Sequence, residues 1–455
     1  MKKNYISMIA ACLSIMLLVP EQAIATDGYF SLAYGTRSKG MGGAGIALYE
    51  TSLFGANNPA GLVRYGKGYG IAAGLFNPNR SYTITGEPSI PNSFPPAFGL
   101  APGKVTSESK LFVMPSIAAN FMVGSKNALG VALYGNGGMN TNYPERTFYS
   151  QYLDGPAMPD GSNPMQGVSE PTGVNLMQLF AAIQYSRALG ENWSIGLSAI
   201  GSWQSFEAKG LQAFVNFGMS QSPMNVTNNG ADRALGIGGK IGIIGKLSEQ
   251  FHVGATFQTP IWMQAFDRYK GLFAEGGKFD VPANWSAGIA YKPTGKLNLV
   301  LDVKQIFYSK VKSIGNRLNT MALMPMVPNG SGGYMGNPMY TPLGSDNGSG
   351  FGWKDMFVVK VGGEYMVSEK STLRVGFSHG QSPVPSSEVL FNILAPGVVE
   401  SHITAGYTRN IGTKALDFAV VYALNNKISG SNPLDPAQQV ELQMNQFEFE
   451  IGFRF

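Results

Sequence analysis

The sequence predicts an all-β fold, a 14-stranded antiparallel transmembrane β-barrel that holds an amino-terminal hatch, or plug, inside its lumen. Segments in which apolar and polar residues alternate recur along most of the 455 residues, and a period of two is typical of a β-strand. Charged residues make up only 13% of the chain, yet no apolar run beyond residue 25 reaches the roughly 18 residues that a membrane-spanning helix needs. The connections between the segments alternate between short and long, as they do in outer-membrane barrels.

Residues 1–25 have the organisation of a secretory signal peptide. Two lysines precede an apolar stretch from Ile6 to Val19, and Ala23-Ile24-Ala25 forms a cleavage site of small residues. The apolar stretch is too short for a transmembrane helix. Cys12, the only cysteine, lies within it, so the mature chain would contain neither a disulfide nor a reactive thiol.

The carboxyl-terminal segment shows the predicted barrel strand most clearly. Its alternate residues are apolar and would face lipid: Phe447, Phe449, Ile451, Phe453 and Phe455. The residues between them, which include Glu448, Glu450 and Arg454, would face a wet lumen. The alternation slips at Asn445 and Gln446, which predicts that the membrane ends there. We expect Gly452, Phe453 and Phe455 to form the signal that the barrel-assembly machinery recognises.

Fourteen segments have this period of two, and the even number agrees with bacterial barrels. They are Gly68–Ile84, Leu111–Val123, Ala128–Tyr134, Asn175–Arg187, Trp193–Lys209, Ala234–Lys246, Phe251–Phe266, Asn284–Tyr291, Leu297–Ser313, Lys354–Met366, Thr372–His379, Ser401–Asn410, Ala415–Leu424 and Leu442–Phe455. Short connections such as Gly124–Asn127 alternate with long ones such as Gly210–Arg233 and Asn425–Glu441. We expect the short ones to be periplasmic turns and the long ones external loops, which places both chain ends in the periplasm.

Residues 26–67 precede the first predicted strand and lack sustained alternation. The segment is rich in glycine, as in Gly40-Met41-Gly42-Gly43-Ala44-Gly45, and is therefore a poor candidate for a long helix. We interpret residues 26–67 as a hatch that folds inside a barrel formed by residues 68–455.

Several short motifs resemble those of one family of outer-membrane transporters. They are Ala44-Gly45-Ile46-Ala47, Asn58-Pro59-Ala60, Val361-Gly362-Gly363-Glu364-Tyr365, Thr372-Leu373-Arg374-Val375-Gly376-Phe377 and Ser382-Pro383-Val384-Pro385. In this order they resemble the FadL/TodX (OMPP1) family of transporters for long-chain fatty acids and other hydrophobic compounds. The resemblance implies a monomer in the outer membrane of a Gram-negative bacterium, surrounded by outer-membrane lipids, that takes up hydrophobic small molecules.

The resemblance also implies a gating apparatus. Family members are known for a hatch that blocks the lumen, a kinked third strand that opens the wall sideways, and lateral delivery of the ligand into the membrane. On this basis Asn58, Pro59 and Ala60 are expected to belong to the hatch. A glycine cluster, Gly135, Gly137 and Gly138, follows a short third strand that ends at Tyr134, and it would either bulge that strand or begin an ordinary loop.

Three long loops have the composition of a site that captures a hydrophobic ligand. The candidate ligand contacts are Leu211, Phe214 and Val215 in a short amphipathic helix that could expose its apolar face, Phe148 and Tyr149 in a second loop, and Met321 and Met324 in a methionine-rich third loop. Each of these side chains could equally pack the loops together. The carboxylate of a fatty acid would need a basic partner, and the candidates are Arg146, Arg233 and Lys312.

Other functions have weaker support in the sequence. A formal net charge of +5, spread along the chain, does not favour nucleic-acid binding, and three dispersed histidines give no metal-ligand spacing. We therefore expect no nucleic acid, no metal and no cofactor. An enzyme would need Ser378 to pair with His379 or His402, and we expect no catalytic residues. A general diffusion porin, a lipase-type enzyme and an adhesive or structural barrel are the alternatives.

Overall fold

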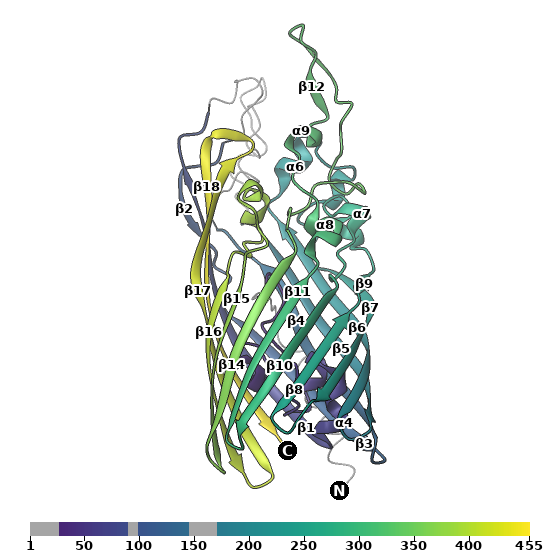
Figure 1. Ribbon diagram of the computed structural model, residues 1–455. Coiled ribbons are helices and arrows are strands. Elements are labelled where there is room, and N and C mark those ends of the chain that lie inside the picture. The colour runs from purple at the N-terminus through teal and green to yellow at the C-terminus, as the bar shows by residue number, and fades with distance from the viewer. Residues whose placement is uncertain (1–26, 90–98, 145–170) are drawn as a thin grey trace.

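A computed structural model describes residues 27–89, 99–144 and 171–455, and the predicted signal peptide, residues 1–25, lies outside these ranges. Within the described residues, fourteen strands form a closed antiparallel barrel, which confirms the predicted fold class (Figure 1). They are β1 (Gly68–Thr85), β3 (Phe112–Val123), β4 (Asn127–Asn140), β5 (Gly173–Leu189), β6 (Trp193–Lys209), β7 (Asp232–Lys246), β8 (Phe251–Gln258), β10 (Asn284–Thr294), β11 (Leu297–Ile306), β14 (Met356–Ser368), β15 (Ser371–Gly380), β16 (Ser401–Ile411), β17 (Lys414–Asn432) and β18 (Asp435–Arg454). The barrel closes where β18 pairs with β1, from Gly70 opposite Arg454 to Thr85 opposite Gln439.

The wall separates two surfaces of different chemistry. Outward side chains are apolar and exposed, as for Ile183 (67%), Ile237 (67%) and Val375 (66%). Their neighbours in sequence, such as Gln184 and Arg374, point inward and are buried. This alternation follows because successive side chains of a strand point to opposite faces of the sheet.

Two predicted strands are shorter than the sequence indicated. β8 ends at Gln258 rather than Phe266, because Pro260 has no N–H to donate to a ladder. The chain then pairs again with β7 through the short β9 (Trp262–Met263). β11 ends at Ile306 rather than Ser313. Another short strand, β2 (Gly103–Thr106), pairs with β1 beyond the residues of β1 that pair with β3.

Two strands of the final hairpin, β17 and β18, occupy most of Asn425–Glu441, so the predicted long loop there is wrong. β17 and β18 stay paired up to Asn432 and Asp435. Burial alternates along β18 from Gln438 to Gly452, but the polarity of its faces inverts near Asn445. From Asn445 back toward the start of β18, the outward side chains are Asn445, Gln443 and Glu441, and the inward side chains are Met444, Leu442 and Val440. The inversion accounts for the slip in the sequence pattern, because an outward face that meets water is polar.

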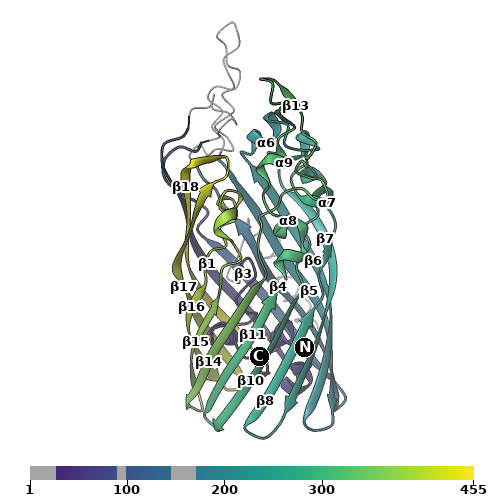
Figure 2. The same ribbon diagram turned by 45° about the horizontal axis from the view of Figure 1, so that its top comes forward.

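The long connections gather at one end of the barrel, where β12 (Met326–Pro328) and β13 (Tyr334–Gly336) form a projecting hairpin (Figures 1 and 2). Their short elements are α6 (Gln212–Asn216), η2 (Pro223–Asn225), η3 (Asp267–Tyr269), α7 (Ala274–Gly277), η4 (Tyr308–Lys310), α8 (Lys312–Gly315), α9 (Thr320–Leu323), β12 (Met326–Pro328), β13 (Tyr334–Gly336), η5 (Ser386–Glu388) and η6 (Phe391–Ile393). Their buried side chains join the inward side chains of the upper wall in one apolar cluster. No helix among the described residues is long and apolar enough to cross a membrane.

Residues 27–67 lie inside the barrel, toward the end with the short turns (Figure 1). They form α2 (Thr36–Lys39), α3 (Phe54–Asn57), η1 (Pro59–Gly61) and α4 (Leu62–Tyr65), joined by loops. α2 contacts β16, β17 and β18, whereas η1 contacts β5, β6 and β7. This segment, called the hatch below, therefore spans the lumen from one wall to another.

Candidate functional site

The wall has a break between β3 and β4. Their ladder starts at the short turn and stops at the pair Ser116–Tyr134. Both strands continue, but among the described residues the only strand partner of β4 beyond this pair is β5, and a bulge at Asn136 shifts their register. The glycines Gly135, Gly137 and Gly138 lie within β4 at this bulge. The predicted end of the third strand at Tyr134, and with it the alternative that these glycines begin a loop, is wrong.

The hatch backbone occupies the place that β3 leaves beside β4. Phe30 forms an antiparallel bridge with Gly137, and Ser31 N donates a hydrogen bond to Asn136 O (2.7 Å). Gly138 N donates to Tyr29 O (3.1 Å). Glycine is required at position 137, because a Cβ there would lie 1.6 Å from Tyr29 O.

We call this break between β3 and β4, together with the small cavity that lies at it, the gap. It is lined by Met114, Pro115 and Ser116 of β3, by Tyr134 and Gly135 of β4, by Ser31, Ala33, Tyr34, Gly35, Lys39 and Leu53 of the hatch, and by Glu450. The hatch is therefore the inner wall of the gap.

Asp27 tethers the first described residues of the hatch to the opposite side of the barrel. Its Oδ2 accepts hydrogen bonds from Lys360 Nζ (2.8 Å) and Lys304 Nζ (3.2 Å). The Tyr308 hydroxyl donates to the Asp27 carbonyl oxygen. Burial alone would raise the pKa of Asp27, but the two ammonium groups outweigh burial and hold that pKa below its usual value.

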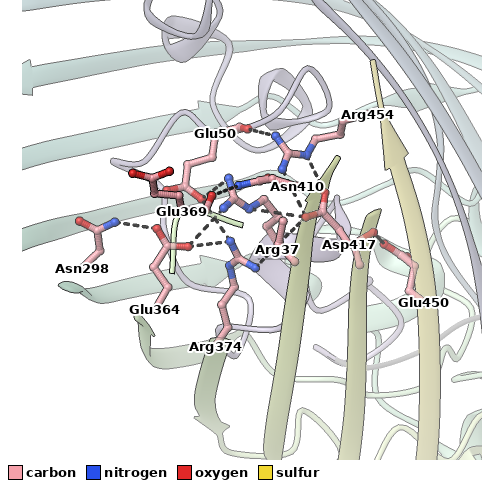
Figure 3. Close-up of polar contacts among 12 residues, drawn as sticks. Arg37, Glu50, Asn298, Glu364, Glu369, Arg374, Asn410, Asp417, Glu450 and Arg454 are labelled. Atoms are coloured by element: carbon pink, nitrogen blue, oxygen red, sulfur yellow. Dashed lines mark hydrogen bonds and ion pairs between the residues drawn. The ribbon is translucent and has the colours of Figure 1, made fainter. Parts of the chain in front are cut away.

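A second set of ion pairs joins the hatch to the wall near the short turns (Figure 3). Arg37 of the hatch lies 2.9 Å from Glu50 and 3.6 Å from Glu364 of β14. The wall adds the pairs Arg374–Glu364 (2.8 Å) and Arg454–Asp417 (2.6 Å). Because these charges are largely buried, removing one would leave its partners only partly compensated.

Lys39 is a further buried anchor. Its ammonium group donates to the carboxylates of Glu448 and Glu450, which the sequence predicted to face the lumen. Burial alone would lower the pKa of Lys39, but the two carboxylates outweigh burial and raise that pKa above its usual value.

The Asn58-Pro59-Ala60 motif holds the hatch against β6 and β7. Asn58 Oδ1 accepts from Ala60 N (3.1 Å), and Asn58 Nδ2 donates to Ile46 O (3.1 Å) and Ile243 O (3.2 Å). Gly242 gives the motif room, because a Cβ there would lie 2.1 Å from Asn58 Oδ1. The motif therefore lies on a different part of the hatch from the residues that border the gap.

The predicted ligand contacts in the loops divide into buried and exposed residues. Leu211 and Phe214 of the α6 region are buried, so the expectation that this helix exposes its apolar face is wrong for both residues. Phe214 lines an apolar cavity of about 30 Å³ together with Phe206, Phe273, Phe351, Phe391 and Leu394. Val215 and Met324 are partly buried against the same cluster, Met321 is 50% exposed, and Phe148 and Tyr149 lie outside the described residues.

A sequence model of the outer membrane protein transport protein (OMPP1/FadL/TodX) family matches residues 32–447 of the chain. The chain belongs to this family. As a family member it is an outer-membrane transport protein for hydrophobic compounds, and the family consists of transport proteins rather than enzymes. No curated protein sequence matches the chain.

Three solved structures of such transport proteins share the fold. The Pseudomonas putida toluene transporter TodX has a TM-score of 0.62 at 17% identity, over 93% of this chain and 98% of TodX. The Ralstonia pickettii toluene transporter TbuX gives 0.56 at 18% identity over 93% and 98%. A Pseudomonas aeruginosa FadL homologue gives 0.63 at 13% identity over 94% and 99%. At these identities the likeness establishes the OMPP1/FadL/TodX fold alone.

The residues proposed for a lipase-type enzyme do not form a catalytic pair among the described residues. Ser378 Oγ is buried and has no hydrogen-bond partner in residues 27–89, 99–144 and 171–455, although Ser378 lies opposite His402 in the ladder of β15 and β16. His379 Nδ1 lies 2.9 Å from Ser401 Oγ instead. No group of residues in the described parts of the chain has the composition of a metal site.

The candidate partners for a ligand carboxylate lie away from the lumen. Arg233 is exposed, Lys312 pairs with Glu275 at the surface (3.2 Å), and Arg146 lies outside the described residues. Sequence reasoning missed Lys240, which is buried in the lumen. The only signal for it was a lysine at an inward position of a predicted strand.

The carboxyl-terminal residues close the barrel. Phe455 and Tyr69 exchange two backbone hydrogen bonds (3.0 and 3.1 Å), and their rings stack with centroids 5.7 Å apart. Gly452 faces the hatch, because a Cβ there would lie 2.6 Å from Thr36 Oγ1. The end of the chain therefore joins β1 and borders the hatch.

Proposed function

We propose that the protein takes up hydrophobic compounds by releasing them sideways through the gap between β3 and β4. A compound binds to the apolar external loops, enters the upper lumen, and leaves through the wall when the hatch segment Asp27–Gly35 moves. One observation carries the proposal: the ladder is interrupted beyond Ser116–Tyr134, and hatch backbone stands where the neighbouring strand would pair.

The upper lumen supports an apolar route toward the gap. Phe214 and Phe391 line the apolar cavity, and below it the rings of Tyr29 and Tyr308 lie 5.4 Å apart, with Trp353 6.0 Å from Tyr29. Transfer of a hydrophobic solute from water to each such apolar surface is favourable, because it lowers the free energy of the solute. Met321, half-exposed at the outer end, has the flexible thioether that suits initial capture of varied compounds.

The proposed substrate range covers long-chain fatty acids and aromatic or aliphatic hydrocarbons. TodX and TbuX are named toluene transporters, and a third structural neighbour is named a FadL homologue. All these compounds would use the same apolar capture surface and the same lateral exit.

A reversible cross-link across the gap tests the lateral exit. Pro115 and Gly135 both line the gap, and they are the next positions after the last pair, Ser116–Tyr134. In a Pro115→Cys/Gly135→Cys variant, a bis-methanethiosulfonate reagent should lower the uptake of labelled dodecanoate and toluene several-fold. A reductant should restore uptake, because it cleaves the bridge.

A matched control is the Val375→Cys/Ala405→Cys variant. These residues are paired between β15 and β16, and both face outward. The same bridge there should leave uptake unchanged. Uptake that survives bridging of the gap would refute the lateral exit.

We also propose that the protein works as a monomer embedded in outer-membrane lipids and is assembled by the barrel-assembly machinery through Gly452, Phe453 and Phe455. Replacing Phe455 with alanine should lower the amount of folded barrel, measured by its electrophoretic mobility without heating. Normal amounts of folded protein would count against this assignment.

A further inference from the structure

A second luminal cavity lies on the other side of the hatch segment that borders the gap. Its wall residues come from β7, β8, β10, β11 and β14, and its volume is about 50 Å³. Ser31, Ala33 and Tyr34 line both this cavity and the gap. The cavity has room for a small polar group, since roughly 10–15 Å³ of such space is enough to hold one water molecule.

In the described parts of the chain, this cavity is lined by a lysine without an ion-pair partner and by two side-chain amides whose N–H groups lack acceptors. Lys240 is 7% exposed; its ammonium group donates to Ala56 O and lies 5.6 Å from the centre of the Tyr34 ring. Among the described residues no carboxylate lies within ion-pair distance of this ammonium group. Gln258 Nε2 and Asn284 Nδ2, on side chains 2% and 7% exposed, also line the cavity and have no acceptor in the described parts of the chain.

The charges around the cavity do not cancel. Lys240, Lys304 and Lys360 supply three positive charges, and Asp27 and Asp302 supply two negative ones, which leaves a net charge of +1 at the ordinary ionisation states. Asp302 does not offset Lys240 directly. Its Oδ2 accepts from Gly45 N (2.7 Å) and Ile46 N (2.8 Å), and its Oδ1 lies against Gly288 of the wall. An uncompensated buried charge is costly, so one further negative charge would stabilise this arrangement.

We propose that this cavity binds the carboxylate of an organic monoanion. Lys240 supplies the ion pair, and the amides of Gln258 and Asn284 supply two hydrogen bonds to the carboxylate oxygens. A single negative charge matches the net +1, and a planar group with two acceptor oxygens matches donors on three neighbouring strands, β7, β8 and β10.

The carboxylate has two sources that share this chemistry. It is the head group of a transported amphiphile, in which case the inference rests on the proposed function and narrows its substrate class, or it is a small free carboxylate resident in the lumen. The hatch residues shared with the gap make the first source geometrically accessible.

Calorimetric titration of the purified mature protein in detergent tests the site with three probes, octanoate, methyl octanoate and acetate. Hydrogen bonds to a charged group contribute enough that octanoate should bind at least about tenfold more tightly than its methyl ester. The Lys240→Met variant should bring the two affinities to within about twofold, through weaker binding of octanoate. Gln258→Leu should lower the preference in part and serves as the second variant if Lys240→Met does not fold. Lys427→Met, which breaks an exposed pair with Glu441 (2.8 Å), is the matched control and should keep the full preference.

The three probes separate the possible outcomes. If acetate binds as well as octanoate, and the binding of acetate depends on Lys240, the site holds free carboxylates. If octanoate binds in a Lys240-dependent way and acetate does not bind, the site holds the head group of an amphiphile. Both results support the site. Equal affinity for octanoate and its ester without acetate binding, or a preference that persists in both Lys240→Met and Gln258→Leu, would overturn it. If neither octanoate nor its ester binds, the result counts against the proposed function, but binding of acetate would still support the site. If none of the three probes binds, both the site and the proposed function are overturned.

Discussion

Replacing Gly137 with alanine should loosen the hatch from the bulged strand β4. The added Cβ would lie 1.6 Å from Tyr29 O, whereas real Cβ contacts are essentially never shorter than 3.0 Å. Tyr29 must therefore retreat by roughly 1.4 Å, the difference between these two distances. β4 cannot retreat instead, because β5 holds it on its other edge.

The retreat breaks or weakens two backbone hydrogen bonds. These are Gly138 N to Tyr29 O (3.1 Å) and Ser31 N to Asn136 O (2.7 Å). Each intramolecular hydrogen bond contributes about 0.5–1.5 kcal/mol net, so together they contribute about 1–3 kcal/mol. The population in which the segment is detached should rise about 5- to 150-fold.

Hydrogen exchange measured by mass spectrometry reports this population directly. Peptides covering residues 27–35 should exchange faster in Gly137→Ala by that factor, and uptake should rise with it if detachment limits transport. Gly201→Ala is the matched control on the same wall, because the nearest atom to a Cβ at Gly201 is Ala181 O at 3.8 Å. Unchanged exchange in a folded Gly137→Ala barrel would refute the role of this contact.

Three other expectations follow from the hatch contacts. Lys39→Met leaves the buried carboxylates of Glu448 and Glu450 uncompensated, so it should lower the free energy of unfolding by about 3–5 kcal/mol, measured by urea titration. Lys427→Met removes an exposed ion pair and should lower the free energy of unfolding by about 1 kcal/mol or less. The folded-state pKa of Asp27 lies below the usual 3.8, so its ion pairs with Lys304 and Lys360 are present above about pH 4 and are lost as pH falls through the folded-state pKa. Hydrogen exchange of residues 27–35, corrected for intrinsic rates, should therefore rise only below about pH 4. The Asp27→Asn variant should abolish that pH dependence. Planar-bilayer recordings should show no large steady conductance, and a large one would favour a general diffusion porin.

The fold was predictable from the sequence because a barrel wall between two solvents imposes a period of two on every strand. The pattern fails where that rule is replaced by another. At Pro260 the missing N–H ends β8, and at Asn445 the outer solvent changes from lipid to water while the strand continues. At Gly135 the sequence could not decide between a bulge and a loop, since glycine permits both.

The site was less predictable because its contacts join residues that are far apart in sequence. Asp27 meets Lys304 and Lys360 across 277 and 333 positions, and no local pattern at either end announces the pairing. Lys240 was missed for the same reason: an inward lysine is expected to face water, and only the packed hatch makes it buried. Phe214 was recognised as an apolar residue, but its burial depends on η6, far along the chain.

The hatch and the gap are coupled by the backbone hydrogen bonds that they share. Where β3 leaves β4, the Asn136 carbonyl and the Gly138 N–H would lack partners, and unpaired backbone groups are costly beside lipid because no water replaces the missing partner. Hatch residues Tyr29 and Ser31 supply those partners. Detaching the segment to open the gap therefore exposes two polar groups at the same moment as it clears the route. An opening that admits water or a polar head group lowers this cost, whereas a purely apolar occupant does not, so the gap should open more readily for an amphiphile than for a hydrocarbon of equal size.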